Sequence, residues 1–264
     1  MLLDVRSLTV ELPTPTGWVR PVQDVSLRIA PGEALGLVGE SGSGKTMLSL
    51  ALMGLLPPGA RVSGEAWFDV TQALLPVPSD SSSNHGVNLL SLPPDALRSL
   101  RGRALSMVFQ EPMTALNPVL RVGTQIEEAV RAHEPRLDRA SVRRRTLAAL
   151  ERAAVPEPAL RARQFPHQLS GGLRQRALIA MALTGSPRLL IADEPTTALD
   201  VTIQKQILDL LARLQRELGL ALLFITHDLG VVAQVASRLA VLYAGRIVEE
   251  GPARDVLTRP RHPY

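Results

Sequence analysis

The sequence predicts an α/β fold built on a mostly parallel β-sheet. Near-continuous apolar runs of strand length, such as "EALGLVG" and "ALLFI", alternate with longer segments of helical spacing, which is typical of a parallel sheet covered by helices. Residues 2–30 instead alternate apolar and polar side chains around the turn-rich "PTPTG", which predicts antiparallel strands. From about Thr124 to Met181 nearly every segment has helical periodicity. We therefore expect a parallel core with an N-terminal antiparallel β subdomain and an inserted α-helical subdomain.

This pattern assigns all 264 residues to a single domain. We expect residues 1–109 and 188–264 to form the core with its antiparallel strands, and residues 110–187 to form the helical subdomain. After the strand "EALGLVG", the helix "KTMLSLALMGLL" is expected to end at Pro57-Pro58-Gly59. Residues 76–95 are rich in Pro, Ser and Asn and are expected to form a flexible surface loop. The strands "RLLIAD" and "LALLFITHD" follow the helical subdomain, with the helix "TIQKQILDLLARLQREL" between them.

Composition limits the location and partners of the chain. No apolar run approaches the ~20 residues needed to span a bilayer, and the first residues, "MLLDVRSLTVEL", carry acids within their apolar pattern and lack the cleavage site of a signal peptide. The absence of cysteine excludes disulfides, thiolate metal sites and cysteine catalysis, and fits a cytoplasmic chain. The net charge is +4, and all basic residues except Lys45 and Lys205 are arginine. The densest basic run, Arg139 with Arg143 to Arg145, also contains apolar residues, so a solvated helix face is favoured over a nucleic-acid surface.

The stretch "GESGSGKT" fits the phosphate-loop pattern G-x-x-x-x-G-K-[ST] at every fixed position. It comprises Gly39, Glu40, Ser41, Gly42, Ser43, Gly44, Lys45 and Thr46, and it lies between a predicted strand and a predicted helix, as the motif requires. Its glycines let backbone N–H groups close around a β-phosphate, while Lys45 can lie between β- and γ-phosphate oxygens and the Thr46 hydroxyl can bind Mg²⁺. Lysine is kept here in an arginine-rich chain because a compact ammonium fits where a planar guanidinium does not. The alternative is a glycine-rich turn without a ligand.

Other apolar runs end in residues that could complete such a site. "RLLIADEP" ends in Asp193 and Glu194, at the kind of strand end where open α/β sheets bind ligands. Asp193 is suited to hold the hydration shell of Mg²⁺, and Glu194 is suited to polarise the water that attacks a γ-phosphate. His227 ends "LLFITH" and could donate to the γ-phosphate, and Gln110 ends "MVFQ" and could bind Mg²⁺ and position water. Taken alone, two acids can simply begin a loop, and a single histidine is more often structural.

A second glycine-rich cradle follows in "FPHQLSGGLRQR". Ser170, Gly171 and Gly172 precede an arginine-rich, helix-forming run, so exposed backbone N–H groups and the positive end of the helix dipole point to one place. A helix cap without a ligand is the alternative interpretation.

The chain resembles the ATP-binding-cassette (ABC) ATPases over nearly its whole length. The resemblance lies in the order of its motifs: the phosphate loop, Gln110, "LSGGLRQR", "LLIADE", "TALD" and His227. The resemblance implies a P-loop NTPase with a RecA-like core that binds ATP and Mg²⁺ and hydrolyses ATP. In that family two cassettes dimerise head to tail, so that the phosphate loop of one and the signature motif of the other enclose each ATP. The signature corresponds here to Ser170, Gly171 and Gly172, and the family's D-loop to "TALD", which ends in Asp200. The fifth signature position, usually Gln, is Leu173.

Longer stretches, among them "QEPMTALNPVLRVGTQI" and "RPRHPY", are similar to the ATPase subunits of peptide and nickel importers. This resemblance implies a subunit that powers a di- or oligopeptide importer from the cytoplasmic face of the cell membrane, with nickel or another small solute as alternative substrates. The implied partners are a second ABC ATPase subunit, in a homo- or heterodimer, two integral-membrane permease subunits and, indirectly, an extracytoplasmic solute-binding protein, but no nucleic acid. Non-transport cassette ATPases and small kinases or GTPases share the phosphate loop, but a kinase or GTPase does not explain "LSGGLRQR".

Two features depart from the family pattern. An aromatic residue usually stacks on adenine a short distance before the phosphate loop. The corresponding place in this sequence is Thr16, with Trp18 just after it, so either region could cover the base. Many relatives also continue beyond "RHPY", which makes a chain ending at Tyr264 either a short member or a truncated one.

Overall fold

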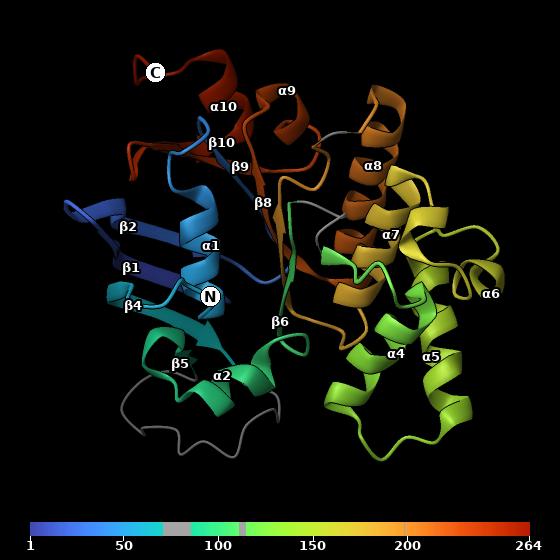
Figure 1. Cartoon of the computed structure of the whole chain (residues 1–264). Helices are drawn as coiled ribbons and strands as arrows, with labels where there is room; N and C mark the ends of the chain where they lie inside the picture. Colours follow the sequence, from blue (N-terminus) through green and yellow to red (C-terminus); the bar gives the residue numbers. More distant parts are fainter. Residues whose placement is uncertain (71–85, 111–114, 198) are drawn as a thin grey trace.

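The computed structural model describes residues 1–70, 86–110, 115–197 and 199–264 (Figure 1). Within these residues the larger sheet has six strands in the order β10-β9-β3-β8-β7-β6. They are β3 (Ala34–Val38), β6 (Leu105–Val108), β7 (Leu189–Asp193), β8 (Ala221–Thr226), β9 (Arg238–Tyr243) and β10 (Arg246–Pro252). β10 pairs antiparallel with β9, and the other pairings are parallel. The carboxyl ends of the parallel strands therefore meet at one edge of the sheet.

Both faces of this sheet are buried, which explains the continuous apolar runs of its strands. In β3, Leu35 and Leu37 belong to one hydrophobic cluster, whereas Ala34 and Val38 belong to another on the opposite face. The strands β7 and β8 alternate between the same two clusters. The first cluster also contains the antiparallel strands and helix α1 (Lys45–Met53), and the second contains α7 (Gly171–Ala182) and α8 (Val201–Leu218). The large sheet thus separates two cores.

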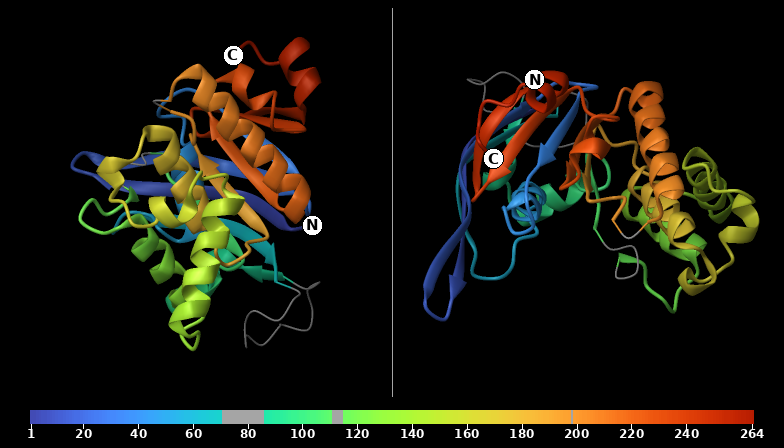
Figure 2. Two further views of the ribbon diagram at one scale, coloured as in Figure 1. Left: turned by 90° about the vertical axis from the view of Figure 1, so that its right-hand side faces the viewer. Right: turned by 90° about the horizontal axis from the view of Figure 1, so that it is seen from above.

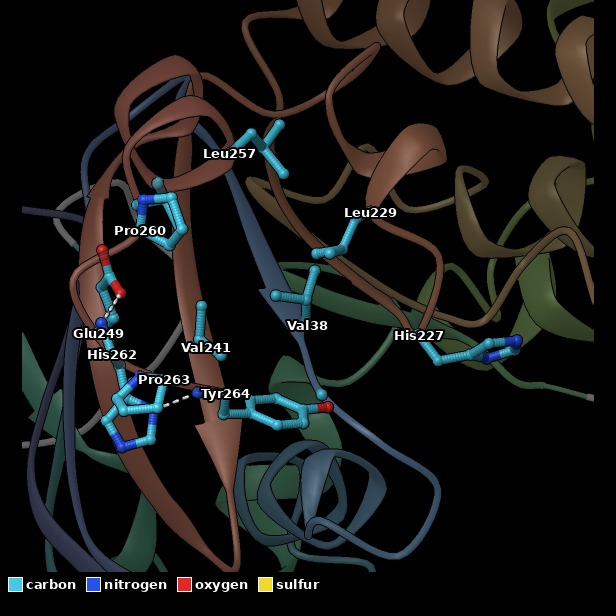
Figure 3. Close-up of a pocket in the computed structure, with 12 residues that line it drawn as sticks. Val38, His227, Leu229, Val241, Glu249, Leu257, Pro260, His262, Pro263 and Tyr264 are labelled. Atoms are coloured by element: carbon cyan, nitrogen blue, oxygen red, sulfur yellow. Dashed lines mark hydrogen bonds between the residues drawn. The ribbon is translucent and has the colours of Figure 1, made fainter.

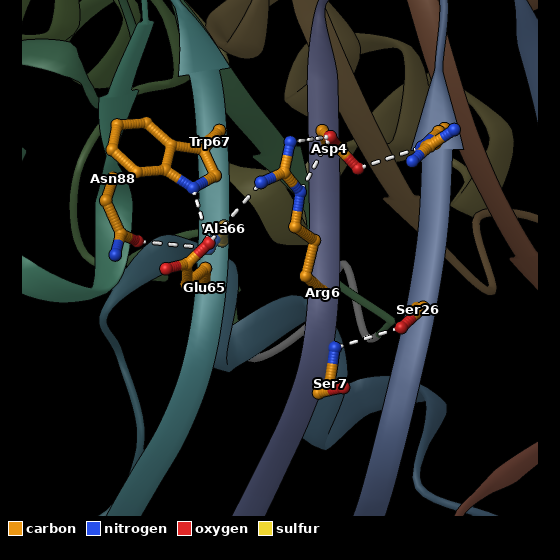
Figure 4. A network of polar contacts seen from close by, with 9 residues as sticks. Asp4, Arg6, Ser7, Ser26, Glu65, Ala66, Trp67 and Asn88 are labelled. Atoms are coloured by element: carbon orange, nitrogen blue, oxygen red, sulfur yellow. Dashed lines mark hydrogen bonds and ion pairs between the residues drawn. The ribbon is translucent and has the colours of Figure 1, made fainter. Parts of the chain in front are cut away.

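The smaller sheet has four strands within the described residues, in the order β2-β1-β4-β5. They are β1 (Leu3–Thr14), β2 (Gly17–Ile29), β4 (Arg61–Asp69) and β5 (Gly86–Asn88). A polar network covers part of one face: Asp4 pairs with Arg6 at 2.7 Å and with Arg28 at 3.1 Å, and the Trp67 indole donates to Glu65 at 2.8 Å (Figure 4). Surface ion pairs of this kind contribute only about 0–1 kcal/mol each. The apolar face, which packs on α1, therefore holds this sheet in place.

The helical subdomain lies on the side of the large sheet away from α1 (Figure 2). Its helices are α4 (Val122–His133), α5 (Arg139–Arg152), α6 (Pro158–Arg161) and α7, and they leave the sheet after β6 and return to it at β7. The other α-helices within the described residues are α2 (Pro94–Leu100), α8, α9 (Leu229–Val232) and α10 (Ala253–Thr258), and a 3₁₀ helix spans Pro166–Gln168 before α7. Among the described helices, none combines the length and apolar character needed to cross a bilayer. The expected parallel core, antiparallel β subdomain and helical insertion are confirmed.

The helix after the phosphate loop is shorter than expected. It ends at Met53 and not at Pro57, because Gly54 adopts a left-handed conformation, with φ 60°, and its N–H closes the last turn on Ala51. The Arg101 guanidinium then binds the carbonyl oxygens of Met53 and Gly54 at 2.7 and 2.8 Å. A glycine within an apolar run was the signal for this helix end.

The expected loop at residues 76–95 is wrong for its second half, and residues 76–85 lie outside the described residues. Residues 86–88 form β5, a short 3₁₀ helix spans Leu89–Ser91, and α2 begins at Pro94. The Asn88 side chain accepts from the backbone N–H groups of Ala66, at 3.0 Å, and Leu90, at 3.2 Å, and Leu89 is only 2% exposed. The polar composition predicted a loop, but Asn88 ends β5, bonds to β4 and caps the 3₁₀ helix that follows.

Candidate active site

Four parallel strands deliver polar residues to one edge of the large sheet. β3 leads into the phosphate loop, Gln110 follows β6, β7 ends at Asp193, and His227 comes directly after β8. Each of these strands is buried, and its functional residue lies at its end or within two residues after it. Because parallel neighbours present their carboxyl ends together, residues distant in sequence converge here.

The phosphate loop turns tightly between β3 and α1. Gly44 has a φ of 107°, and a Cβ on it would lie 2.0 Å from the carbonyl oxygen of Pro21. A Cβ on Gly39 would lie 2.2 Å from the carbonyl oxygen of Leu242. Both positions therefore require glycine. Since Gly44 has no side chain to accept from the first-turn N–H groups of α1, these groups are available to an anion.

Lys45 begins α1 and places its ammonium inside the loop. Its Nζ donates to the carbonyl oxygens of Gly39, at 2.8 Å, and Glu40, at 2.7 Å, and the residue is 5% exposed. Burial lowers the pKa of Lys45, while the charges of Glu194 and Asp193 act against this shift. The two acids thus help to keep a positive charge in the loop, where it can attract the phosphate groups of a ligand.

Asp193 has the properties of a cation ligand. It is 1% exposed, and its Oδ1 has no hydrogen-bond partner among the described residues. Burial raises the pKa of this carboxyl, and a hydrogen bond with the Thr46 side chain opposes the rise. A buried, unpaired carboxylate oxygen beside a hydroxyl fits Mg²⁺, which is commonly held by one or two carboxylates together with phosphate and water oxygens.

Glu194 is at the centre of a hydrogen-bonded cluster. Its Oε2 accepts from Gln110 Nε2 at 3.1 Å and from Thr197 Oγ1 at 2.9 Å, and its Oε1 lies 3.2 Å from His227 Nδ1. The backbone of Glu194 has a φ of 45°, a left-handed conformation that is unfavourable for this residue type. Its N–H donates to the carbonyl oxygen of Ile225 at 2.9 Å, which helps to hold that conformation. The structure therefore brings Gln110, Glu194 and His227 together, as the sequence predicts for residues that share a site.

Thr197 was not singled out from the sequence. Its hydroxyl donates to Glu194 from within the turn that follows β7, in which the Thr197 N–H also donates to the Glu194 carbonyl oxygen at 3.2 Å. The spacing of three residues between a hydroxyl and a carboxylate in a tight turn was the available signal.

The second glycine cradle is the N-terminus of α7. Ser170 caps this helix by accepting from the Leu173 N–H at 3.4 Å, and both Ser170 and Gly171 are exposed. A Cβ on Gly172 would lie 2.6 Å from Ile203 Cγ2, so this glycine allows α7 to approach α8 closely. Leu173 is half-buried against the core, so its side chain is held there and does not replace the polar contact of a Gln. Within the described residues, no hydrogen bond links this cradle to the phosphate loop.

Asp200 lies beside this cradle and caps α8. Its Oδ1 accepts from the Ile203 N–H at 2.9 Å, and Asp200 itself is exposed. The preceding Leu199 is close to the signature, because a Cβ on Gly171 would lie 3.2 Å from its side chain. The turn before α8 and the start of α7 therefore form one exposed surface.

The candidate adenine residues lie at the hairpin between β1 and β2. Trp18 is 44% exposed, and the Arg61 guanidinium lies 3.9 Å from its ring centroid. Thr16 lies in the turn itself, with its hydroxyl 3.4 Å from that of Thr14. Further along β2, Pro21 contacts Gly44 of the phosphate loop, so the hairpin is connected to the loop through this strand.

The fold and the site define an ATP-binding cassette. The family model "ABC transporter" matches residues 22–197, which include the phosphate loop, Gln110, the second cradle and Glu194. The chain belongs to the ABC transporter family.

Curated relatives match over the whole chain. The oligopeptide transport ATP-binding protein OppD of Bacillus subtilis is 46% identical, and the match covers 100% of this chain and 69% of that protein. The dipeptide transport ATP-binding protein DppD of Haemophilus influenzae is 48% identical, with 100% and 75% covered. Among solved structures, the dimeric post-hydrolysis state of the ATP-binding cassette MJ0796, bound to ADP and Pi, superposes with a TM-score of 0.79 at 28% identity, covering 96% of this chain and 99% of that one.

Proposed function

We propose that this chain is the ATP-hydrolysing subunit of an importer for di- or oligopeptides. The close approach of Gln110 and His227 to the Glu194 carboxylate, beside the phosphate loop, carries the hydrolytic part of this proposal. The relatives named for oligopeptide and dipeptide transport, at 46% and 48% identity over the full chain, favour peptides over nickel or another small solute.

The phosphate loop binds the ATP phosphates. Residues Gly39, Glu40, Ser41, Gly42, Ser43, Gly44, Lys45 and Thr46 would wrap them with backbone N–H groups. The Lys45 ammonium, held inside the loop by the carbonyl oxygens of Gly39 and Glu40, would neutralise charge on the β- and γ-phosphate oxygens. The Thr46 hydroxyl, the Gln110 carbonyl and the Asp193 carboxylate are the residues that would hold Mg²⁺. When bound, Mg²⁺ neutralises charge on the phosphate oxygens.

Glu194 acts as the general base for the attacking water. Hydrogen bonds from Gln110 and Thr197 to Oε2 fix the orientation of the carboxylate, and Oε1 faces His227. A carboxylate held in this way can accept a proton from water and orient it toward the γ-phosphate. His227 Nδ1 lies 3.2 Å from Glu194 Oε1. In the protonated imidazolium both ring nitrogens carry a hydrogen, so His227 can pair with the carboxylate through Nδ1 and donate to the phosphate through Nε2.

The second cradle serves the ATP of another cassette. Ser170, Gly171 and Gly172 offer a helix N-terminus but no acid or ammonium of their own, and Asp200 flanks them on the same exposed surface. We therefore infer a head-to-tail dimer, with an identical or a paralogous partner. The dimer works on the cytoplasmic face of the membrane, where the helical subdomain at residues 110–187 binds two permease subunits. An extracytoplasmic binding protein acts with them on the other side of the membrane. Trp18 or the Thr16 turn covers adenine.

The peptide assignment is tested in vesicles that contain the chain with its two permease subunits. Hydrolysis of ATP is measured with the binding protein loaded either with a mixture of di- and oligopeptides or with Ni²⁺. Stimulation by the peptides alone is expected. Stimulation by Ni²⁺ and not by peptides would assign the chain to a nickel importer.

A further inference from the structure

The tight turn between β9 and β10, residues 243–246, packs against the phosphate loop. β9 runs parallel to β3 in the sheet, with Val241 opposite Val38 (Figure 3). Because the two strands run in the same direction and in register, the phosphate loop after β3 and the turn after β9 leave the sheet at the same edge. A Cβ on Gly39 would accordingly lie 2.2 Å from the carbonyl oxygen of Leu242. The backbones of the two segments are therefore in close contact.

The β9–β10 turn has an unusual backbone conformation. Its two central residues, Ala244 and Gly245, lie between Tyr243 and Arg246, which pair with each other across the hairpin. Both central residues are left-handed, with φ of 45° at Ala244 and 80° at Gly245, as in the two-residue turns that match the twist of a hairpin. This conformation is unfavourable for alanine, and such residues persist only where the surrounding structure holds them. The contacts of the turn with its neighbours supply that restraint.

Strand β2 holds the turn from one side. The Gln23 N–H donates to the carbonyl oxygen of Gly245 at 2.7 Å, and the Gln23 side-chain amide donates to that of Ala244 at 3.3 Å. Gly245 is buried, and a Cβ on it would lie 2.9 Å from the carbonyl oxygen of Pro21. A larger residue at this position would therefore push the turn away from β2.

The turn in its place holds the phosphate loop. The Gly245 N–H donates to the carbonyl oxygen of Ser43 at 3.0 Å. The Ser43 carbonyl and the Gly44 N–H belong to one planar trans peptide, in which the two groups point in opposite directions. Because the carbonyl is directed at the turn, the Gly44 N–H is directed away from it. Rotation of this peptide would break the bond to Gly245 and turn the N–H of Gly44 at the same time.

We propose that Gly245 is a positioning residue of the ATP site, which holds the Ser43 carbonyl and thereby turns the Gly44 N–H toward the β-phosphate. This inference rests on the proposed function of the phosphate loop in binding ATP. ATP and ADP share the β-phosphate, so the loss of this orientation should weaken both nucleotides by the same factor. A contact made alike in bound ATP and in the transition state changes the affinity and not the turnover at saturating ATP.

The test is Gly245→Ala, whose Cβ would displace the turn and lengthen its bond to Ser43. Titration with fluorescent analogues of ATP and ADP should show roughly threefold to tenfold weaker binding of both, the range of one hydrogen bond. The turnover at saturating ATP should stay within about twofold. Gly219→Ala is the matched control, because Gly219 is also left-handed, with φ 61°, but a Cβ there would meet no described atom within 4 Å. It should bind both nucleotides like the parent chain.

A second variant leaves Gly245 unchanged and covers the case in which Gly245→Ala does not fold. Gln23→Met removes the side-chain bond to the Ala244 carbonyl and should weaken both nucleotides about twofold to threefold, since one of the two bonds from β2 remains. Its control is Gln234→Met, which removes a bond of the same length, from the side-chain amide to the Gly230 carbonyl, away from the phosphate loop.

Hydrogen exchange of the residue 245 amide without nucleotide measures the bond to Ser43 itself. Relative to its intrinsic rate, this amide should exchange faster in Gly245→Ala and in Gln23→Met than in the parent chain. Unchanged exchange would overturn the inference, as would unchanged affinities in a parent chain that binds ATP, weaker binding of ATP alone, or a lower melting temperature as the sole effect. A parent chain that bound neither nucleotide would instead refute the proposed function, and the amide exchange would still decide whether the turn holds the loop.

Discussion

The two glycine-rich helix N-termini of this protein look alike in sequence but differ in their surroundings. At the start of α1, Lys45 is buried, and β7 supplies Asp193 and Glu194 alongside it. At the start of α7, Ser170 and Gly171 are exposed, and Ser170 itself accepts from the helix N–H of Leu173. The first N-terminus therefore has the charges needed for chemistry, whereas the second offers only a surface for an anion. The glycines are common to both N-termini, so the difference in chemistry comes from the acidic residues that the neighbouring strands place beside the first one.

The largest effect that this comparison predicts is at the first cradle. Glu194→Gln keeps the size of the side chain but cannot accept a proton, so hydrolysis should fall roughly 100-fold or more, with ATP binding retained. A single-turnover assay and a binding titration measure the two quantities. The exposed acid Asp209 on α8 provides the control, since Asp209→Asn should hydrolyse ATP normally. A near-normal single-turnover rate in Glu194→Gln would remove this residue from the role of base.

Loss of the ammonium should act on binding itself. Lys45→Ala should weaken ATP affinity about 10-fold to 100-fold, because a charged group directed at phosphate oxygens is removed. Isothermal titration with ATP and Mg²⁺ measures this, with Lys205→Ala, an exposed lysine on α8, as the control. Affinity equal to that of the parent would contradict the assignment of the loop.

The second cradle should respond in the opposite way. Ser170→Arg should leave ATP binding nearly intact, since the nucleotide of the same chain is held by the phosphate loop. Hydrolysis and ATP-dependent dimerisation should fall together by about 10-fold, the equivalent of ~1.4 kcal/mol. Light scattering with ATP, using a hydrolysis-deficient background, follows the dimer.

The control for the loss of a helix cap is Asp138→Ala, which removes the cap of α5. This variant should lower the free energy of unfolding by ~1 kcal/mol without lowering ATP hydrolysis. Mixing Ser170→Arg with a Lys45→Ala partner should restore part of the activity, because both defects then fall at one shared site. Normal ATP-dependent dimerisation by Ser170→Arg would refute action on the partner's ATP.

The smallest effect is expected from the two glycines of the signature, whose substitutions should change different properties of the protein. Gly172→Ala should lower the free energy of unfolding by about 1–3 kcal/mol, since its Cβ would meet Ile203 at 2.6 Å. Gly171→Ala should alter stability less, since its Cβ would meet only the Leu199 side chain at 3.2 Å, and should instead lower hydrolysis. Urea unfolding and ATPase assays on both variants make the comparison. Equal losses of stability would show that both glycines serve packing.

The elements that could be predicted from the sequence are those whose burial requires a particular residue pattern. The strands β3, β7 and β8 could be predicted because burial on both faces requires continuous apolar runs, and the residues after them could be grouped because parallel strands end together. The end of α1 was missed because the apolar run continues past Gly54 to Leu56, although the glycine itself favours the left-handed conformation that ends the helix. Strand β5 was missed because a Ser- and Pro-rich composition concealed the contacts of Asn88.

The site was likewise predictable in its motif residues and less so in their supports. Glu194, Gln110 and His227 were expected from strand ends, but Thr197 lies in a turn that has no periodic pattern. The packing of Tyr264 on Tyr243 could not be foreseen, because it depends on how residues 259–264 return to the end of β9 through the pairing of β9 with β10. Such contacts depend on tertiary packing and leave no local signal.

The helical subdomain leaves the sheet after β6 and returns at β7, and these two strands are direct neighbours whose pairing runs from Leu105 with Leu189 to Val108 with Ala192. Because this pairing is parallel, the insertion leaves at the carboxyl end of β6 and returns at the amino end of β7, so it crosses over between two strands that are paired with each other. A change in its length or surface need not disturb the register of the strands that precede Gln110 and Glu194. In evolutionary terms, such an insertion can change its length and outer surface while the hydrolytic centre is inherited unchanged.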